Sequence, residues 1–488
     1  MMRIVVVFSF IAGFFLMATL GGVASGEAKR ASLKPTTQAS GRSETQPTNI
    51  AKPPAPSDVR RARNAGPEER ARAVQEASSE PSAGDESVAK EAAANAVDTD
   101  SPGDDENKPV PSPPAPVSVA STPPADVRKA LDGVDLSAMK LSSGKYRQRT
   151  EDGREIQFTV DAEVQKYTDA LFAQYEVPAA AAVLMNSHTG RVIALTQERS
   201  IADAAPSSAV ALDASPPAAS VFKIVTTAAL LDNGIPLTRE TCYSGGSGGL
   251  DMQHIQDALP KNHACVSVST ALGRSVNAVF AKLSDKFLSR KILASYADRF
   301  GFNRPLEFDV PIQNSSAEIP AERLERARTA AGFWHTHLSP VHAASIVQSL
   351  AQGGAMLRPY VVDRVVAADG KTMYEAKTKY LGHTVSKETA DALKRALVYT
   401  TAHGTARKAF HDAHGRPFLP GIDVAGKTGT LTGDKPYRAY TWFVGLAPEN
   451  DPEVAVSVLV VNTPKWRIKA PQAAAMILKK YFDKKKRR

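Results

Sequence analysis

The four residues Lys427-Thr428-Gly429-Thr430 end an apolar stretch, 422–427, that predicts a β-strand. Two more strands are predicted after it, at 440–446 and 454–461. Near the start of the same region, residues 179–195 predict a β-hairpin with a turn at Ser187-His188-Thr189-Gly190. Helices are predicted between the two groups of strands. This order favours an α/β (α+β) fold, in which a mainly antiparallel sheet is completed from both ends of the domain and is flanked by helices.

The helices are predicted from apolar periodicity and from residues that begin or end a helix. Asp161 offers a cap to a helix that carries Val164 and Leu171, just after an alternating strand at 156–160. Ser220 begins another helix, which ends before Gly234. Further helices are predicted at 268–288, 290–300, from Ser339-Pro340, at 386–400 and at 471–482.

The motif Ser220-Val221-Phe222-Lys223 places an amine three residues after a hydroxyl. Because positions i and i+3 share a face of a helix, Lys223 can reach the oxygen of Ser220. A serine needs a base that removes its proton during attack, and a lysine serves only when it is neutral. Burial and a second cation both lower the pKa of a lysine, and we expect Lys427 to be that cation.

A second motif, Ser275-Val276-Asn277, lies inside the predicted helix at 268–288. Ser275 can relay a proton to a leaving amine, and Asn277 can hold both Lys223 and a substrate amide. By itself this triplet is also what an ordinary helix surface presents. Its weight comes from its order between the other two motifs.

The third motif, at Lys427 to Thr430, suits the remaining tasks of acyl transfer. Gly429 has no side chain, so a substrate backbone can lie against the strand edge. Lys427 and the hydroxyls of Thr428 and Thr430 can attract a terminal carboxylate. The backbone N–H groups of Ser220 and Thr430 can together stabilise an oxyanion.

A serine followed three residues later by a lysine is weak evidence alone, since it also occurs at 87–90, 137–140 and 142–145. The first copy lies in a low-complexity segment and the other two lie at the edge of the folded region. Ser220 differs because it opens an apolar helix and has both companion motifs downstream.

With the three motifs in this order, the chain resembles the transpeptidase-type penicillin-binding proteins of the serine D,D-peptidase and β-lactamase superfamily. The resemblance covers roughly residues 134–483 and includes Pro217-Ala218-Ala219, 403–406 and 440–446. It implies a helical subdomain and a sheet subdomain that meet at an active cleft. It also implies that D-Ala-D-Ala stem peptides of peptidoglycan acylate Ser220 and that an amine or water then accepts the acyl group. β-Lactams are the implied inhibitors.

The chain departs from this family in three respects. Ala218-Ala219 stands directly before the serine, where larger members carry Pro-Gly. A tether takes the place of a folded pedestal domain, and no glycosyltransferase domain is predicted. These departures leave open the subclass, transpeptidase or D,D-carboxypeptidase.

Two other functions also stay open. Residues 217–224 are similar to the oxacillin-hydrolysing serine β-lactamases apart from one extra alanine, although Asn277 and the long tether favour a transpeptidase. A non-catalytic scaffold or antibiotic sensor on the same fold is the third interpretation. The intact set of motifs argues against it.

The N-terminal residues 1–25 predict a membrane anchor or a signal peptide. Residues 4–24 are almost continuously apolar and are numerous enough to span a bilayer, and small residues at 24–26 offer a cleavage site. The length favours a single-pass anchor in the inner membrane with the catalytic domain in the periplasm, secretion being the alternative. Residues 26–133 are rich in Ala, Pro, Ser and Glu, which predicts a disordered tether before a transpeptidase domain at 134–488.

The formal net charge of +9 lies partly in Lys479, Lys480 and the tail 484–488. A solvated helix end is the predicted structure of this tail, with attraction to anionic lipid or wall polymer as the alternative. No motif favours nucleic acid as a partner. The resemblance makes a cell-wall synthesis complex a candidate partner.

Cys242 and Cys265 are the 2 cysteines of the chain. They predict a disulfide in an oxidising compartment, with two buried thiols as the alternative. His335 and His337 lack the spacing of metal ligands, so neither a metal nor another cofactor is predicted.

Overall fold

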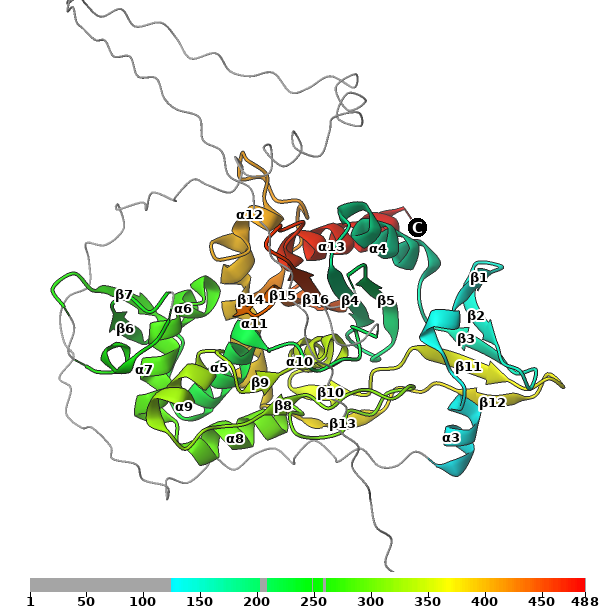
Figure 1. The fold of residues 1–488 in the computed structure, drawn as a ribbon, viewed down its shortest axis with the longest axis horizontal. Coiled ribbons are helices and arrows are strands. Elements are labelled where there is room, and N and C mark those ends of the chain that lie inside the picture. The colour runs from blue at the N-terminus through cyan, green and yellow to red at the C-terminus, as the bar shows by residue number, and fades with distance from the viewer. Residues whose placement is uncertain (1–123, 202–208, 248, 258–259, 488) are drawn as a thin grey trace, which may run out of the picture. The chain divides into compact units, whose positions relative to one another are not determined.

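A computed structural model describes residues 124–201, 209–247, 249–257 and 260–487 (Figure 1). The predicted anchor or signal segment and nearly all of the predicted tether lie outside these residues. Helix α3 (Ala125–Leu131) lies in the range assigned to the tether and packs against strand β12 (Thr372–Glu375), so ordered structure begins before residue 134. Among the residues described, no helix is long and apolar enough to cross a membrane.

The centre of the domain is a five-stranded antiparallel sheet in the order β14-β15-β16-β4-β5. Strand β16 pairs with β4, which joins the three C-terminal strands to the early hairpin. The predicted sheet, completed from both ends of the domain, is therefore confirmed. Its strands are β4 (Ala179–Asn186), β5 (Val192–Arg199), β14 (Ala425–Asp434), β15 (Tyr437–Ala447) and β16 (Val454–Asn462).

Helices cover both faces of this sheet. Successive side chains of a strand point to opposite faces, so Ala181 and Val183 join the core that includes α10, whereas Ala180 and Ala182 join the core built with α4 and α13. Every residue of α10 is buried, as its place against the sheet requires. These helices are α4 (Ala162–Tyr175), α10 (Pro340–Ala351) and α13 (Ala470–Lys486). The first two begin where predicted, and α13 continues four residues beyond the predicted end at 482.

Seven of the remaining helices that the structure describes form or adjoin the subdomain beside β14 (Figure 1), and the last of them, α12 (Arg407–Phe410), also packs against α13. Ser289 and Ser386 cap the two helices that confirm the predictions at 290–300 and 386–400. The set consists of α5 (Lys223–Asp232), α6 (Val268–Arg274), α7 (Asn277–Phe287), α8 (Arg290–Arg299), α9 (Arg323–Ala330), α11 (Lys387–Ala402) and α12 (Arg407–Phe410).

The single helix predicted at 268–288 is wrong, because the chain breaks between α6 and α7. Ser275 has φ 57° and Val276 is extended, and the Val276 N–H donates to the Ala271 carbonyl at 2.9 Å. The left-handed position that ends a helix is usually glycine or asparagine. A serine there gives no sequence signal for a stop.

A second five-stranded sheet, in the order β1-β2-β3-β11-β12, was not predicted apart from its strand near 156–160. Its strands are short and half-exposed, and β3 pairs with β11 from some two hundred residues later, so no local pattern marks the pairing. The first four are β1 (Lys140–Ser142), β2 (Lys145–Arg149), β3 (Glu155–Phe158) and β11 (Val362–Val366). Three small ribbons pair β6 (Glu240–Tyr243) with β7 (Ala264–Ser267), β8 (Ser316–Ala317) with β9 (Thr336–His337), and β10 (Ala355–Leu357) with β13 (Tyr380–His383).

Candidate active site

Ser220 lies in a short 3₁₀ turn, η2 (Ala219–Phe222), that leads directly into α5. The regular helix therefore begins at Lys223 instead of at Ser220. Residues i and i+3 are eclipsed in a 3₁₀ turn, which brings the lysine directly over the serine. The Lys223 Nζ lies 2.8 Å from Ser220 Oγ, and the lysine is fully buried.

The backbone before the serine is held in an unfavourable conformation. Ala219 has φ 50°, a left-handed conformation that costs an L-residue about 1–2 kcal/mol. The Trp442 Nε1–H donates to the Pro217 carbonyl at 2.9 Å and holds the segment on one side. On another side, a Cβ at Gly332 would lie 2.4 Å from the Ala219 oxygen, so a side chain does not fit there. The packing around the turn therefore fixes the direction of Ser220.

Three oxygen atoms surround the amine of Lys223. Its Nζ lies 2.7 Å from Asn277 Oδ1 and 2.5 Å from the Ala331 carbonyl oxygen, and both of these oxygens can only accept. The charged form can donate to all three oxygens, whereas the neutral form uses two N–H groups for these acceptors and turns its lone pair toward the Ser220 hydroxyl. Burial lowers the pKa of Lys223 well below its usual value, and the nearby charge of Lys427 lowers this pKa further. The amine is thus set to remove the proton of the serine.

Lys427 is the second buried amine of the site. Its Nζ donates to Ser275 Oγ at 2.8 Å and to the Thr428 carbonyl at 2.8 Å, and its side chain is fully buried. Burial lowers the pKa of Lys427 to about 7. A further N–H of the charged form remains for a ligand. Lys427 can therefore bind an anion near neutral pH and also depress the pKa of Lys223.

The break between α6 and α7 sets the direction of the Ser-Val-Asn motif. Ser275 ends α6 and contacts Lys427, whereas Asn277 begins α7 and contacts Lys223. The Asn277 Nδ2 faces the Gly246 carbonyl at 3.4 Å, which leaves its Oδ1 toward the lysine. An unbroken helix would place residues i and i+2 on different faces. The left-handed serine is what lets both side chains reach the site.

The Lys-Thr-Gly-Thr residues lie within β14, which is an edge strand of the central sheet. The strand passes close to the nucleophile, because a Cβ at Gly429 would lie 3.2 Å from Ala219 Cβ and 3.4 Å from the Ser220 nitrogen. Thr428 and Thr430 lie two residues apart and so share the other face of the strand. Thr428 is nearly buried, whereas Thr430 is exposed.

All three motifs thus meet around Ser220, which is the arrangement that their order along the chain predicts. Residues 180–482 match the family model of the penicillin-binding protein transpeptidase domain, over more than half of the chain. The chain belongs to this penicillin-binding protein transpeptidase family.

Relatives and solved structures agree with this family. The chain is 27% identical over 342 residues to stage V sporulation protein D of Bacillus subtilis, covering 65% of this chain and 51% of that protein. It is 28% identical over 298 residues to the peptidoglycan D,D-transpeptidase PbpA of Mycobacterium tuberculosis, covering 57% of each. The chain spans about half the length of the curated relatives it matches.

Solved structures show the same fold. A D,D-transpeptidase domain of a peptidoglycan glycosyltransferase from Eggerthella lenta has a TM-score of 0.57 at 23% identity, covering 68% of this chain and 84% of that chain. Penicillin-binding protein A of M. tuberculosis, solved as a ceftriaxone acyl-enzyme complex, has a TM-score of 0.55 at 24% identity, covering 68% and 80%. The predicted transpeptidase fold is therefore confirmed.

Three contributors to this transpeptidase site were not predicted as site residues. The Ala331 carbonyl gives no sequence signal, because any residue carries one. Trp442 anchors the segment before the serine, and Thr405 bonds Thr428 through their hydroxyls at 2.5 Å. Both lie in stretches that carry the family resemblance, 403–406 and 440–446, and this was the signal that pointed to them.

The two cysteines lie opposite each other in β6 and β7, and they form the predicted disulfide. His263 lies close to Cys242 and Cys265, with the ligand atoms of all three within 4.8 Å of one another. Sulfurs that are bonded to each other carry no thiolate for a metal. The disulfide therefore closes the loop that carries Gly246, and His263 lies beside it.

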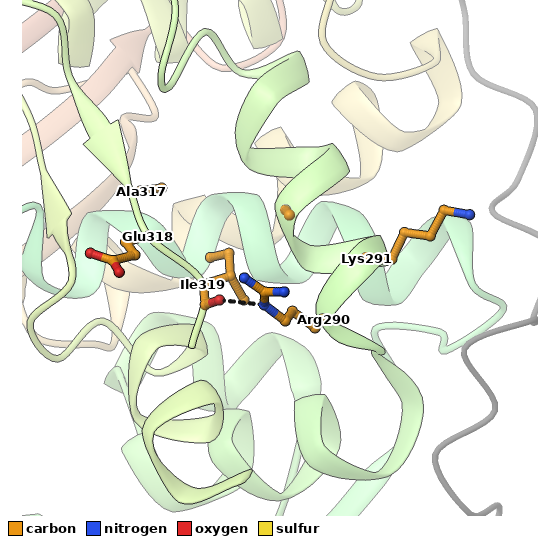
Figure 2. A pocket seen from close by; sticks show the side chains of 6 residues that line it. Arg290, Lys291, Ala317, Glu318 and Ile319 are labelled. Carbon is orange, nitrogen blue, oxygen red and sulfur yellow. Dashed lines mark hydrogen bonds between the residues drawn. The ribbon is translucent and has the colours of Figure 1, made fainter. Parts of the chain in front are cut away.

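A surface pocket of about 460 Å³ lies between α8 and the chain that follows β8 (Figure 2). Its lining residues are Arg290, Lys291, Ala294, Ala317, Glu318 and Ile319. The Arg290 guanidinium points to the Ile319 carbonyl and donates to it at 2.7 Å, whereas Lys291 points away (Figure 2). None of the residues around Ser220 lines this pocket. The hydrogen bond from Arg290 links α8 to the segment after β8, so these residues have a structural role.

Proposed function

We propose that this chain is a serine D,D-transpeptidase that cross-links peptidoglycan stem peptides ending in D-Ala-D-Ala. The observation that carries the proposal is the fully buried Lys223, with two obligate acceptors and the Ser220 hydroxyl around one nitrogen. A general base of this kind contributes about a hundred- to ten-thousand-fold to a rate. The membership of the transpeptidase family supports the same reaction.

The proposed reaction has two half-steps. Ser220 Oγ attacks the carbonyl carbon between the two D-alanines while Lys223 takes its proton, and the N–H groups of Ser220 and Thr430 stabilise the oxyanion. The C–N bond then breaks, and the proton returns from Lys223 by way of Ser275 to the departing amine of D-Ala. In the second half-step an amine of a neighbouring stem peptide attacks the ester carbonyl and gives up a proton to Lys223. The bond from the carbonyl carbon to Ser220 Oγ then breaks, and this proton returns to the serine oxygen.

The substrate is proposed to lie as an added strand along β14. Lys427, Thr428 and Thr430 bind its terminal carboxylate, and Asn277 holds the amide before the scissile bond. A β-lactam carries an amide, a reactive carbonyl and a carboxylate in the same order. We therefore expect penicillins to acylate Ser220 and to inhibit the enzyme.

The full-length chain, incubated with a fluorescent penicillin, tests the acylation. We expect one lasting adduct per chain, located at Ser220 by mass spectrometry of its peptides, and no adduct in Ser220→Ala. Rapid turnover of the penicillin without a lasting adduct would show a β-lactamase instead. No reaction at all would favour a scaffold.

A D-Ala-D-Ala peptide with and without an amine acceptor then distinguishes the acceptors. We expect D-Ala release together with a new amide product when the amine is present. Release of D-Ala with only the free acid as product would show a D,D-carboxypeptidase.

We also propose that the catalytic domain acts outside the cytoplasmic membrane and is tethered to it. The apolar residues 4–24 and the disulfide between Cys242 and Cys265 support this location, since disulfides persist in oxidising compartments. A thiol reagent that does not cross membranes, added to intact cells carrying an introduced cysteine at exposed Lys387, tests it. Labelling supports an external domain, and protection until lysis contradicts it.

A further inference from the structure

Thr405 links two walls of the site from a turn between α11 and α12. Its backbone N–H donates to the Gly273 carbonyl at 3.1 Å, and Gly273 lies two residues before Ser275. Its Oγ1 lies 2.5 Å from the Oγ1 of Thr428, the residue after Lys427. One residue therefore contacts the segments that carry the second and third motifs.

Close packing of glycines fixes the position of this turn. A Cβ at Gly404 would lie 2.2 Å from the Gly273 oxygen, and a Cβ at Gly273 would lie 2.5 Å from the Tyr399 ring. The Gly404 N–H also donates to the Tyr399 carbonyl at 2.7 Å. With the backbone set by these contacts, the hydroxyl of Thr405 is pre-organised toward Thr428.

Each of the two threonine hydroxyls can donate only one hydrogen bond. A threonine hydroxyl has one proton and two lone pairs. The Thr405 hydroxyl has two acceptors within reach, the Gly273 carbonyl at 3.4 Å and the Thr428 hydroxyl at the shorter distance of 2.5 Å. Either hydroxyl can donate in the shorter contact, and when Thr405 is the donor the proton of Thr428 is left for an anion in the cleft.

We propose that Thr405 is a positioning residue that aims the hydroxyl of Thr428 at the terminal carboxylate of the substrate. This inference rests on the proposed function, because it presumes a substrate with that carboxylate. Thr405 donates to Thr428, and Thr428 donates to the carboxylate. Hydrogen bonds in such a chain strengthen one another, so the second bond weakens when the first is removed.

The test compares two acyl-D-alanyl thioesters whose leaving groups end in a carboxylate or in the matching carboxamide. For the full-length chain, Thr405→Val is expected to raise KM about threefold to tenfold for the carboxylate, because the bond from Thr428 to this charged group is weakened and misdirected. It should leave kcat nearly unchanged and alter the carboxamide less than about twofold. Thr405→Ser keeps the hydroxyl and should restore the preference for the carboxylate.

Two outcomes contradict the role of Thr405, and a third contradicts the proposed function as well. Equal KM values for wild type and Thr405→Val on the carboxylate overturn the role of Thr405. Equal losses on both thioesters also overturn it, since they show only a disturbed fold, and Thr405→Ala with its thermal unfolding midpoint checks this. A wild type that cleaves neither thioester overturns the proposed function and this inference with it.

Discussion

The buried Arg358 and the two buried lysines of the site, Lys223 and Lys427, have opposite surroundings. Arg358 contacts carboxylates, with Asp309 accepting from its Nη2 and Glu307 lying 3.0 Å from its Nε. Burial by itself lowers the pKa of Arg358, but the charge of Asp309, together with Tyr374 and the hydrogen bonds to both residues, raises the pKa above its usual value. Lys223 and Lys427 are buried as deeply, and no carboxylate forms an ion pair with either among the residues that the structure describes.

The difference separates a structural cation from a reactive one. Asp309 also accepts the backbone N–H groups of Val361 at 2.6 Å and Val362 at 2.8 Å, so the Arg358 cluster fixes the chain where β11 begins. The lysines of the site have only neutral partners and each other, and the pKa of each is lowered. A buried cation with a carboxylate stays charged, whereas one without it becomes a base.

The largest expected effect is on the reactive side. Lys223→Met should slow penicillin acylation by about a thousandfold, because the serine loses its general base. Its free energy of unfolding should change by less than about 3 kcal/mol, since the removal of a buried amine favours folding while the Asn277 and Ala331 oxygens lose their donor. Acylation kinetics and chemical denaturation measure the two quantities.

Lys394→Met is the matched control, because Lys394 is also nearly buried but pairs with Asp391 at 2.9 Å, outside the site. We expect its acylation rate to equal that of the wild type. A Lys223→Met variant that acylates at the wild-type rate would remove the lysine from the mechanism.

The next effect is on the structural side. Asp309→Ala leaves Arg358 without its main buried partner, which typically costs about 3–5 kcal/mol of unfolding free energy. The acylation rate of the folded fraction should stay unchanged. Urea unfolding measures the loss.

The control for this change is Asp363→Ala, which removes the partly exposed pair with Arg191 at 3.0 Å. Exposed pairs contribute about 0–1 kcal/mol, so the loss there should be small. Equal losses for Asp309→Ala and Asp363→Ala would contradict the distinction between the buried and the exposed pair.

The pH dependence sharpens the comparison further. With the pKa of Lys427 near 7, kcat/KM for a carboxylate substrate should fall about tenfold per pH unit above that value, as the anion-binding charge is lost. Stability should move in the opposite direction. The pKa of the lysine is lower in the folded chain than its usual 10.5, so the unfolded chain binds more protons between the two values and stability rises with pH there.

Both profiles can be measured on one preparation, with a substrate that does not titrate between pH 6 and 9. A kcat/KM that stays flat across about pH 6–9 would show that Lys427 keeps its charge throughout.

The smallest expected effect concerns the backbone next to the nucleophile. Ala219→Gly relieves the left-handed strain but loses a buried methyl group, so its stability should lie within about 1 kcal/mol of the wild type. Ala228→Gly, at a buried position inside α5, loses the methyl group without relief and should cost about 1–2 kcal/mol. Thermal unfolding of the two variants compares them. Equal losses would show that Ala219 stores no strain.

Local sequence was sufficient for features that depend on neighbours within a few residues. Asp161 and Ser339 cap their helices as predicted, because a cap bonds N–H groups two or three residues away. The proximity of Lys223 to Ser220 also follows from three residues of spacing, although the turn is 3₁₀ and not α. These interactions need no distant partner.

The structure corrected the features in which distant segments decide. The break at Ser275 lies where Gly273 packs against Gly404 and where Lys427 donates a hydrogen bond to the serine. These partners lie more than a hundred residues away along the chain. The second sheet likewise depends on β3 meeting β11.

The sequence by itself therefore determined which groups carry the chemistry, since the order of three short motifs specifies a nucleophile, a base and an anion-binding strand. Only the tertiary structure decided their protonation and direction. Packing buries the two lysines with neutral hydrogen-bond partners and holds Ser275 in a left-handed conformation. Packing also brings in residues such as Ala331 and Thr405, which no motif marks.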